Sequence, residues 1–159
     1  MAKKLFITGT GTDIGKTYVT GLILKKLQES GRRVAYYKAA MSGNERDADG
    51  RLIPGDALHV KTVSGITQPL KTMCPYVYEA AVSPHLASRL EGDPVQLDVV
   101  KAGFEKVCGA YDYVTVEGSG GIVCPIDFDN SKLQLEDVIG ELDLSSILIA
   151  DAGLGTING

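Results

Sequence analysis

The chain has 159 residues, of which 44% are hydrophobic and 23% are charged, and its formal net charge is −4. This amount of apolar material is enough for one hydrophobic core, so we expect a single domain over 1–159. An acidic balance without a block of lysine and arginine argues against a nucleic-acid partner held by bulk charge. No apolar run approaches the ~20 residues of a membrane span, so no membrane partner is expected.

Cysteine and histidine usage favours a reducing compartment. The three cysteines are widely spaced without a Cys-x-x-Cys pattern, and there are only two histidines. This spacing gives no zinc site. The segment before the first predicted strand is too short for a signal peptide. We therefore expect a cytoplasmic protein with reduced thiols.

The N-terminal segment carries the most specific motif. A buried strand is predicted over 3–8, and it leads into the glycine-rich turn GTGTDIGKT at 9–17. A helix is predicted over 16–30, because apolar residues recur there at helical spacing. Such a strand, loop and helix cradle phosphate with backbone N–H groups and the positive helix end. Lys16 would reach the outer phosphates, and the Thr17 hydroxyl could hold Mg²⁺.

The spacing of this loop departs from the strict phosphate-loop pattern. Five residues rather than four separate Gly9 from Gly15, and Thr10 stands where the strict pattern requires glycine. The alternative interpretation is a glycine-rich turn with a chance lysine. The strand and helix on either side favour the nucleotide-type phosphate site.

Strands and helices alternate along the rest of the chain, which predicts an α/β fold with a mostly parallel sheet. The remaining elements that we expect, in chain order, are a strand at 33–37, a polar loop at 42–54, a helix at 56–63, a weak strand at 76–78, a helix from Pro84 to Gly92, a helix at 97–109, a strand at 113–116, a helix at 133–142 and a strand at 146–150.

Ligands of open α/β sheets bind outside the carboxyl ends of the strands, so the residues at these ends matter most. Lys38 follows the second strand and would bring another positive charge to the phosphate edge. Glu117 follows the strand at 113–116, and its carboxylate could coordinate Mg²⁺. The alternatives are a solvated surface lysine and a turn carboxylate. Asp56 has no adjacent strand that would place it at this edge.

The chain stops at 151–159, just past a strand and at the opening of a further helix. We therefore expect the fold to be truncated at the C-terminus. A naturally short, frayed terminus is the alternative.

Six short segments of the chain form a distinctive set: TGTGTDIGKT at 8–17, YK at 37–38 followed by SG at 42–43, GDAL at 55–58, SPH at 83–85, VEGSGG at 116–121 and LGTIN at 154–158. Together they resemble one enzyme family, the dethiobiotin synthetases. The lengthened loop spacing is itself the pattern of this family. The resemblance covers essentially the whole chain and implies a P-loop NTPase-like fold, with a mostly parallel sheet flanked by helices.

The resemblance also implies roles for individual residues. Lys38 and Lys16 would be catalytic, and Thr12, Lys38 and Ser42 would contact the substrate. Thr17, Asp56 and Glu117 would serve Mg²⁺. The nucleotide would be contacted by Asp13, Ile14, Gly15, Lys16, Thr17, Tyr18, Asp56, Glu117, Gly118, Ser119, Gly120 and Asn158.

The activity that the resemblance implies is an ATP-dependent cyclo-ligase reaction of biotin biosynthesis. ATP, CO₂ (or bicarbonate) and 7,8-diaminononanoate would give dethiobiotin, ADP and phosphate through a carbamate and a mixed carbamic-phosphoric anhydride. Family members act as homodimers. Two departures from the family pattern are Ala39, where proline often follows the lysine, and Asp13, where glutamate is common.

Two other functions remain open from the residues alone. One is a regulatory ATPase switch of the partitioning or cell-division type, although such proteins often carry a second lysine inside the loop and positions 9–14 contain none. The other is a ligase related to the cobyrinate amidotransferases, which share the fold and a similar loop.

Overall fold

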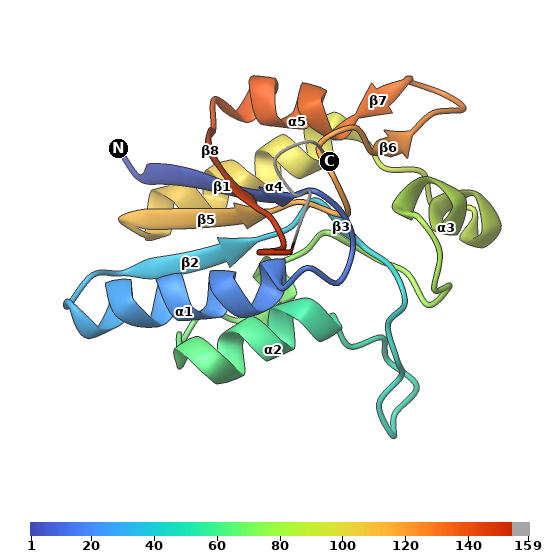
Figure 1. The fold of residues 1–159 in the computed structure, drawn as a ribbon. Helices are drawn as coiled ribbons and strands as arrows, with labels where there is room; N and C mark the ends of the chain where they lie inside the picture. Colours follow the sequence, from blue (N-terminus) through green and yellow to red (C-terminus); the bar gives the residue numbers. More distant parts are fainter. Residues whose placement is uncertain (154–159) are drawn as a thin grey trace.

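The computed structural model describes residues 1–153, and its centre is a four-stranded parallel sheet with helices on both faces (Figure 1). The order across the sheet is β2-β5-β1-β8, and every neighbouring pair is parallel. The strands are β1 (Lys3–Gly9), β2 (Val34–Tyr37), β5 (Tyr113–Glu117) and β8 (Ser145–Ile149). The predicted α/β class with a mostly parallel sheet is confirmed.

Two helices cover one face of the sheet and two cover the other (Figure 1). On the first face, α1 (Lys16–Glu29) and α2 (Gly55–Ser64) enclose a core that contains Leu24, Tyr36 and Val60. On the second face, α4 (Leu97–Ala110) and α5 (Leu135–Leu142) enclose a core that contains Tyr37 and Phe104. The side chains of alternate β2 residues therefore point into opposite cores, as the two-residue period of a strand requires.

The remaining elements are short. They are β3 (Ala40–Met41) paired with β4 (Tyr76–Val77), the 3₁₀ turn η1 (Leu70–Thr72), α3 (Pro84–Glu91), and the antiparallel pair β6 (Pro125–Asp127) and β7 (Leu133–Gln134). The helix α3 begins as predicted, since Ser83 Oγ accepts a hydrogen bond from the Leu86 N–H. Its predicted end is also confirmed, because Gly92 follows it with φ 71°.

The start predicted for the last helix is wrong, whereas the other predicted elements differ from the structure by no more than one residue at either end. The helix expected over 133–142 begins at Leu135, because Leu133 and Gln134 pair with β6. Gln134 then caps the helix in a reciprocal arrangement with Asp137. The polar stretch 42–54 is a loop, as expected, with a single bridge between Arg46 and Leu52.

Over residues 1–153, no helix combines the length and the apolar character needed to cross a bilayer. The carboxyl ends of β1, β2 and β5 meet at one edge of the sheet, because neighbouring parallel strands run in register there. The phosphate loop, Lys38 and Glu117 follow these three strand ends, so the fold brings the predicted groups to one place.

Candidate active site

A cavity of about 450 Å³ opens at the carboxyl edge of the sheet. Its lining combines the start of α1 with the residue after β2 and with residues of α2 and β5, among them Lys16, Thr17, Lys38, Asp56 and Glu117. A second cavity of about 500 Å³ lies beside it and includes Ser42, Ser83 and Ser119. Both cavities are lined by Thr12, Asp13, Lys38, Asp56 and Gly120. Lys38 therefore stands between a compartment at the phosphate loop and a second compartment.

The loop after β1 has the backbone geometry of an anion cradle. Asp13 and Gly15 adopt left-handed backbone conformations, with φ 58° and 91°. A Cβ at Gly9 would lie 2.1 Å from Ile14 Cδ1, so a larger residue there would require the tip of the Ile14 side chain to move. The helix α1 follows without an acidic residue in its first turn. Its N-terminal N–H groups and positive dipole end are thus available to a phosphate.

Lys16 is buried inside this loop. Its side chain is 7% exposed, and its Nζ donates a hydrogen bond to the Gly11 carbonyl at 2.5 Å. Burial and the nearby charge of Lys38 lower the pKa of Lys16. An anionic ligand in the loop would raise the pKa of Lys16 again, because a nearby opposite charge favours the protonated amine.

Lys38 is held by two carboxylates. Its Nζ lies 2.6 Å from Asp56 Oδ2 and 3.1 Å from Glu117 Oε1, and the residue is 6% exposed. Burial opposes the charge on this amine, but the ion pairs with Glu117 and Asp56 outweigh burial and raise the pKa of Lys38. The amine is therefore a fixed positive charge at the boundary of the two cavities.

Glu117 is 2% exposed and is held from three sides. Its Oε1 accepts hydrogen bonds from Thr17 Oγ1 at 2.8 Å and from Lys38. Its Oε2 accepts one from the Tyr36 hydroxyl at 3.3 Å. Tyr36 is in turn fixed by Gln68, whose side chain bonds the Tyr36 N–H and carbonyl at 2.8 and 3.0 Å.

Tyr36 and Gln68 were not predicted as part of the site. Tyr36 and its neighbour Tyr37 lie on opposite faces of β2. In so short a strand, the sequence does not reveal which of the two tyrosines faces the site. Gln68 lies in a segment without a regular pattern. Its contact with β2 spans 32 residues.

The donors around Glu117 fit a magnesium ion. Two carboxylates and the Thr17 hydroxyl supply only oxygen, which Mg²⁺ prefers, and Mg²⁺ usually takes its other ligands from phosphates and water. Over residues 1–153, no group of three or more His, Cys, Asp or Glu side chains could hold a metal. The residues thus suit an ion shared with a phosphate chain, rather than an all-protein cage.

The other predicted residues have different surroundings. Ser42 Oγ donates to the Val82 carbonyl at 2.5 Å, and Ser119 Oγ donates to the Ala40 carbonyl at 3.1 Å, both beside the second cavity. Tyr18 is exposed on the rim of the first cavity. Ile14 packs toward Gly9, and the Gly118 N–H bonds the Ile7 carbonyl, so neither residue lines a cavity wall. Asn158 lies outside the described residues.

Comparison with known proteins decides the family. A family model described as an AAA domain matches residues 3–159. An ATP-dependent dethiobiotin synthetase of Clostridium botulinum (strain Loch Maree / Type A3) is 51% identical over 158 residues, which cover 99% of this chain and 69% of that protein. The chain belongs to the dethiobiotin synthetase family. Another dethiobiotin synthetase, from Brachyspira hyodysenteriae, is 50% identical over 99% of this chain and 70% of its own length.

The fold is also shared with a more distant protein. The signal recognition particle receptor FtsY of Elizabethkingia anophelis, in complex with GDP, aligns with 99% of this dethiobiotin synthetase chain and 44% of its own, with a TM-score of 0.53 and 13% identity. At this identity the likeness concerns the fold alone. Together with the family membership, it agrees with the P-loop architecture inferred from the 9–17 loop.

Proposed function

We propose that this chain carries out the reaction of its family, the ATP-dependent carboxylation and ring closure of 7,8-diaminononanoate to dethiobiotin, with release of ADP and phosphate. The observation that carries the proposal is the position of Lys38. It is a buried, charged lysine that borders both the cavity at the phosphate loop and the second cavity. A phosphoryl transfer between two bound anions needs such a group between them.

In this proposal the first cavity holds the triphosphate. The backbone of 13–17 surrounds the phosphates, Lys16 leaves the Gly11 carbonyl to contact the outer phosphates, and Tyr18 lies at the rim. Thr17, Asp56 and Glu117 would hold Mg²⁺, which neutralises charge on the phosphate oxygens when bound. Ser119 and Gly120 flank this region, and Gly118 fixes the strand end behind them.

The second cavity holds the diamine, with Thr12 and Ser42 as contacts. One amine adds to CO₂ and loses a proton, which gives a carbamate. A carbamate oxygen then attacks the γ-phosphorus and displaces ADP. The neighbouring amine adds to the carbonyl carbon of the mixed anhydride, the C–O bond breaks, and phosphate leaves as the ureido ring closes.

Electrostatics explains why two lysines are needed. Carbamate and triphosphate repel each other, whereas an opposite unit charge ~4 Å away contributes roughly 4 kcal/mol at an effective dielectric of ~20. Lys16 and Lys38 together could hold both anions in line. Positioning and charge stabilisation are most of what phosphoryl transfer requires from a protein.

The proposal is tested by phosphate release from ATP in the presence of Mg²⁺ and bicarbonate. We expect release to depend on 7,8-diaminononanoate, and we expect Lys16→Gln to abolish it. Release that depends instead on a protein partner or a lipid surface would favour the regulatory ATPase switch. A ligase of the cobyrinate type would leave the diamine unused.

We also propose that the chain acts as a homodimer in the cytoplasm. Sedimentation of the purified chain tests whether it is a dimer.

A further inference from the structure

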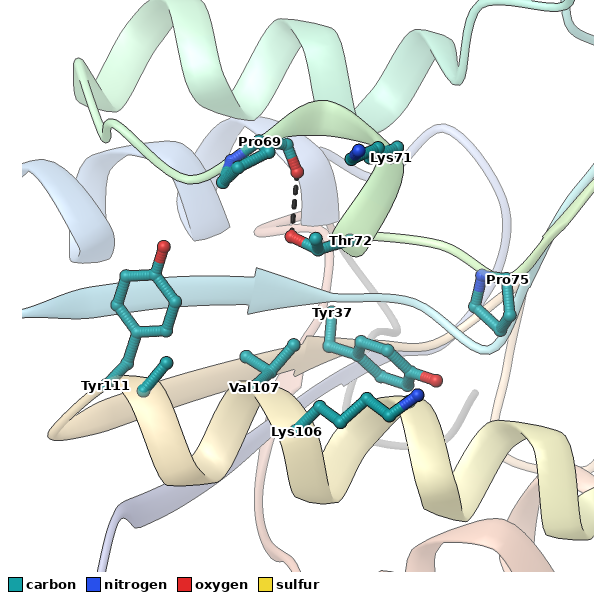
Figure 2. A pocket seen from close by; sticks show the side chains of 10 residues that line it. Tyr37, Pro69, Lys71, Thr72, Pro75, Lys106, Val107 and Tyr111 are labelled. Carbon is teal, nitrogen blue, oxygen red and sulfur yellow. Dashed lines mark hydrogen bonds between the residues drawn. The ribbon is translucent and has the colours of Figure 1, made fainter.

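A groove beside β2, separate from the two cavities described above, has no role in the proposed reaction. It lies between η1 and α4, has a volume of about 470 Å³, and is bordered by Tyr37, Pro69, Thr72, Val107 and Tyr111, with Lys71 and Lys106 at its rim (Figure 2). We call it the η1–α4 groove. Its volume is in the range of small-molecule sites, roughly 300–1,000 Å³.

The walls of the groove are largely apolar, and the hydroxyls of Tyr37 and Thr72 are engaged in hydrogen bonds. The Tyr37 hydroxyl donates to the Val100 carbonyl at 2.7 Å. The Thr72 hydroxyl donates to the Pro69 carbonyl at 2.7 Å, as Figure 2 shows. Proline and tyrosine rings and the Val107 side chain make up most of the remaining surface. Such walls favour an aliphatic or aromatic body over a polar one.

The charge at the rim has one sign. Lys71 and Lys106 are both exposed and line the groove, whereas no carboxylate from the described part of the chain does. Among residues 1–153, neither lysine takes part in an ion pair. In a chain with net charge −4, a cationic rim without a carboxylate is complementary to an anionic head group.

Both walls of the groove connect to the backbone of Lys38. Tyr37, on one wall, is the residue immediately before Lys38. Thr72, on the other wall, is followed by Met73, whose carbonyl accepts a hydrogen bond from the Lys38 N–H at 2.8 Å. A ligand that moves η1 relative to α4 would therefore move the main chain that carries the Lys38 amine.

We propose that the η1–α4 groove is an effector site for medium-chain monocarboxylates, with the aliphatic chain between η1 and α4 and the carboxylate between Lys71 and Lys106. The site lies outside both cavities of the proposed reaction. Occupation of the groove acts on Lys38 through Tyr37 and Met73.

Binding is tested with octanoate and the purified chain by calorimetry, without ATP or diamine. We expect one saturable site, and we expect Lys71→Glu/Lys106→Glu to weaken octanoate binding by about ten-fold or more, since two attractive charges become repulsive. The control Lys25→Glu/Lys132→Glu makes the same change in net charge at exposed positions away from the groove and should bind octanoate like the unmodified chain. The charge-reversed groove should instead prefer octylamine. Absence of saturable octanoate binding, or equal binding by both double variants, would overturn the site.

The coupling to Lys38 is tested separately. Backbone amide resonances of residues 37, 38 and 73 should shift when octanoate binds, and these shifts should vanish in Lys71→Glu/Lys106→Glu. Diamine-dependent phosphate release should change with octanoate in the unmodified chain only. If octanoate binds but causes neither amide shifts at residues 37, 38 and 73 nor a change in the rate of phosphate release, the effector role is overturned. Failure of the proposed reaction would leave the binding and resonance results intact, so the two failures are distinguishable.

Discussion

At the scale of single residues, the contacts around Glu117 connect the phosphate loop to Lys38. One carboxylate accepts hydrogen bonds from Thr17 in α1, from Lys38 just after β2, and from Tyr36 in β2. A buried carboxylate is costly unless it is paired and hydrogen-bonded. These three partners therefore supply the hydrogen bonds that burial of Glu117 requires, and they fix the direction of its side chain toward the cavity.

Replacement of Lys38 by methionine tests the central amine. The variant keeps the phosphate loop, so we expect it to bind ATP. Product formation should fall by about 10²–10³, as removal of one well-placed donor typically causes. Calorimetry with nucleotide and an assay of dethiobiotin formation measure the two effects. Ring closure at an unchanged rate would show that Lys38 has another role.

Tyr36→Phe removes the hydrogen bond to Glu117 Oε2 without touching the cavity surface. Residues that orient a metal ligand typically contribute 10–100-fold in metal affinity. We therefore expect the Mg²⁺ concentration for half-maximal activity to rise by about ten-fold or more. Tyr37→Phe is the matched control, since the Tyr37 hydroxyl bonds the Val100 carbonyl on the other face of the sheet. Equal Mg²⁺ dependence in the two variants would refute the positioning role.

At the scale of elements, close packing of β2 against α4 depends on Gly103. A Cβ at this position would lie 2.6 Å from the Tyr37 hydroxyl oxygen. Because a buried tyrosine on a strand cannot easily move, the helix must shift or the ring must leave its place.

Gly103→Ala should therefore lower the free energy of unfolding by about 1–3 kcal/mol in urea denaturation. The same substitution in a Tyr37→Phe background should cost less, because the clashing oxygen is gone. Gly109→Ala, in the same helix, is the control, because within residues 1–153 an added Cβ there would meet nothing within 4 Å beyond its chain neighbours and the adjacent helix backbone. Identical costs in both backgrounds would exclude this clash as the cause.

The turn between β6 and β7 depends on Asp127. Its carboxylate accepts hydrogen bonds from the Asn130 side chain at 3.1 Å and from the backbone and side chain of Ser131 at 3.0 and 2.9 Å. Burial favours the neutral acid, but the bonds from Ser131 and Asn130 outweigh burial and lower the pKa of Asp127 below its ordinary 3.8. Its contribution to stability is therefore present above that value and is lost as the pH falls through the lowered pKa.

Asp127→Asn should destabilise the chain by about 1–2 kcal/mol at pH 7, since hydrogen bonds to a charged acceptor are replaced by weaker ones. The difference from the unmodified chain should shrink below pH 4, where the carboxylate gains its proton. Thermal unfolding across this range provides the measurement. A difference that is constant with pH would contradict the assignment.

Elements with a clear period were predictable, and short ones were not. The apolar spacing of 16–30 and 97–109 and the serine-proline start at 83–84 correctly predicted helices. The pairs β3–β4 and β6–β7 contain strands of two or three residues, too short for an alternating pattern to show. The partner of Leu133 is on β6, and this pairing replaced two residues of the predicted helix.

At the scale of the whole molecule, the site depends on which elements become neighbours. Lys38 and Glu117 were predictable because parallel strands place their carboxyl ends at one edge. Asp56 lies in the first turn of α2, which follows a loop and not a strand, and its contact with Lys38 results from the packing of α2 on α1 and the β2 face. Sequence alone suggested Asp56 only through the family resemblance, and it gave no sign of Tyr36 or Gln68.

The origin of the oxygen in the released phosphate shows whether a carbamate attacks ATP. If a carbamate oxygen attacks the γ-phosphorus and the C–O bond later breaks, phosphate released in the presence of ATP, diamine and oxygen-18-labelled bicarbonate carries one labelled oxygen. Mass spectrometry of the phosphate, sampled before the label exchanges with water, gives the answer. We expect labelled phosphate from the unmodified chain and none from Lys16→Gln. If the new oxygen in the phosphate came from water and not from bicarbonate, the chain would hydrolyse ATP, which would contradict attack by a carbamate.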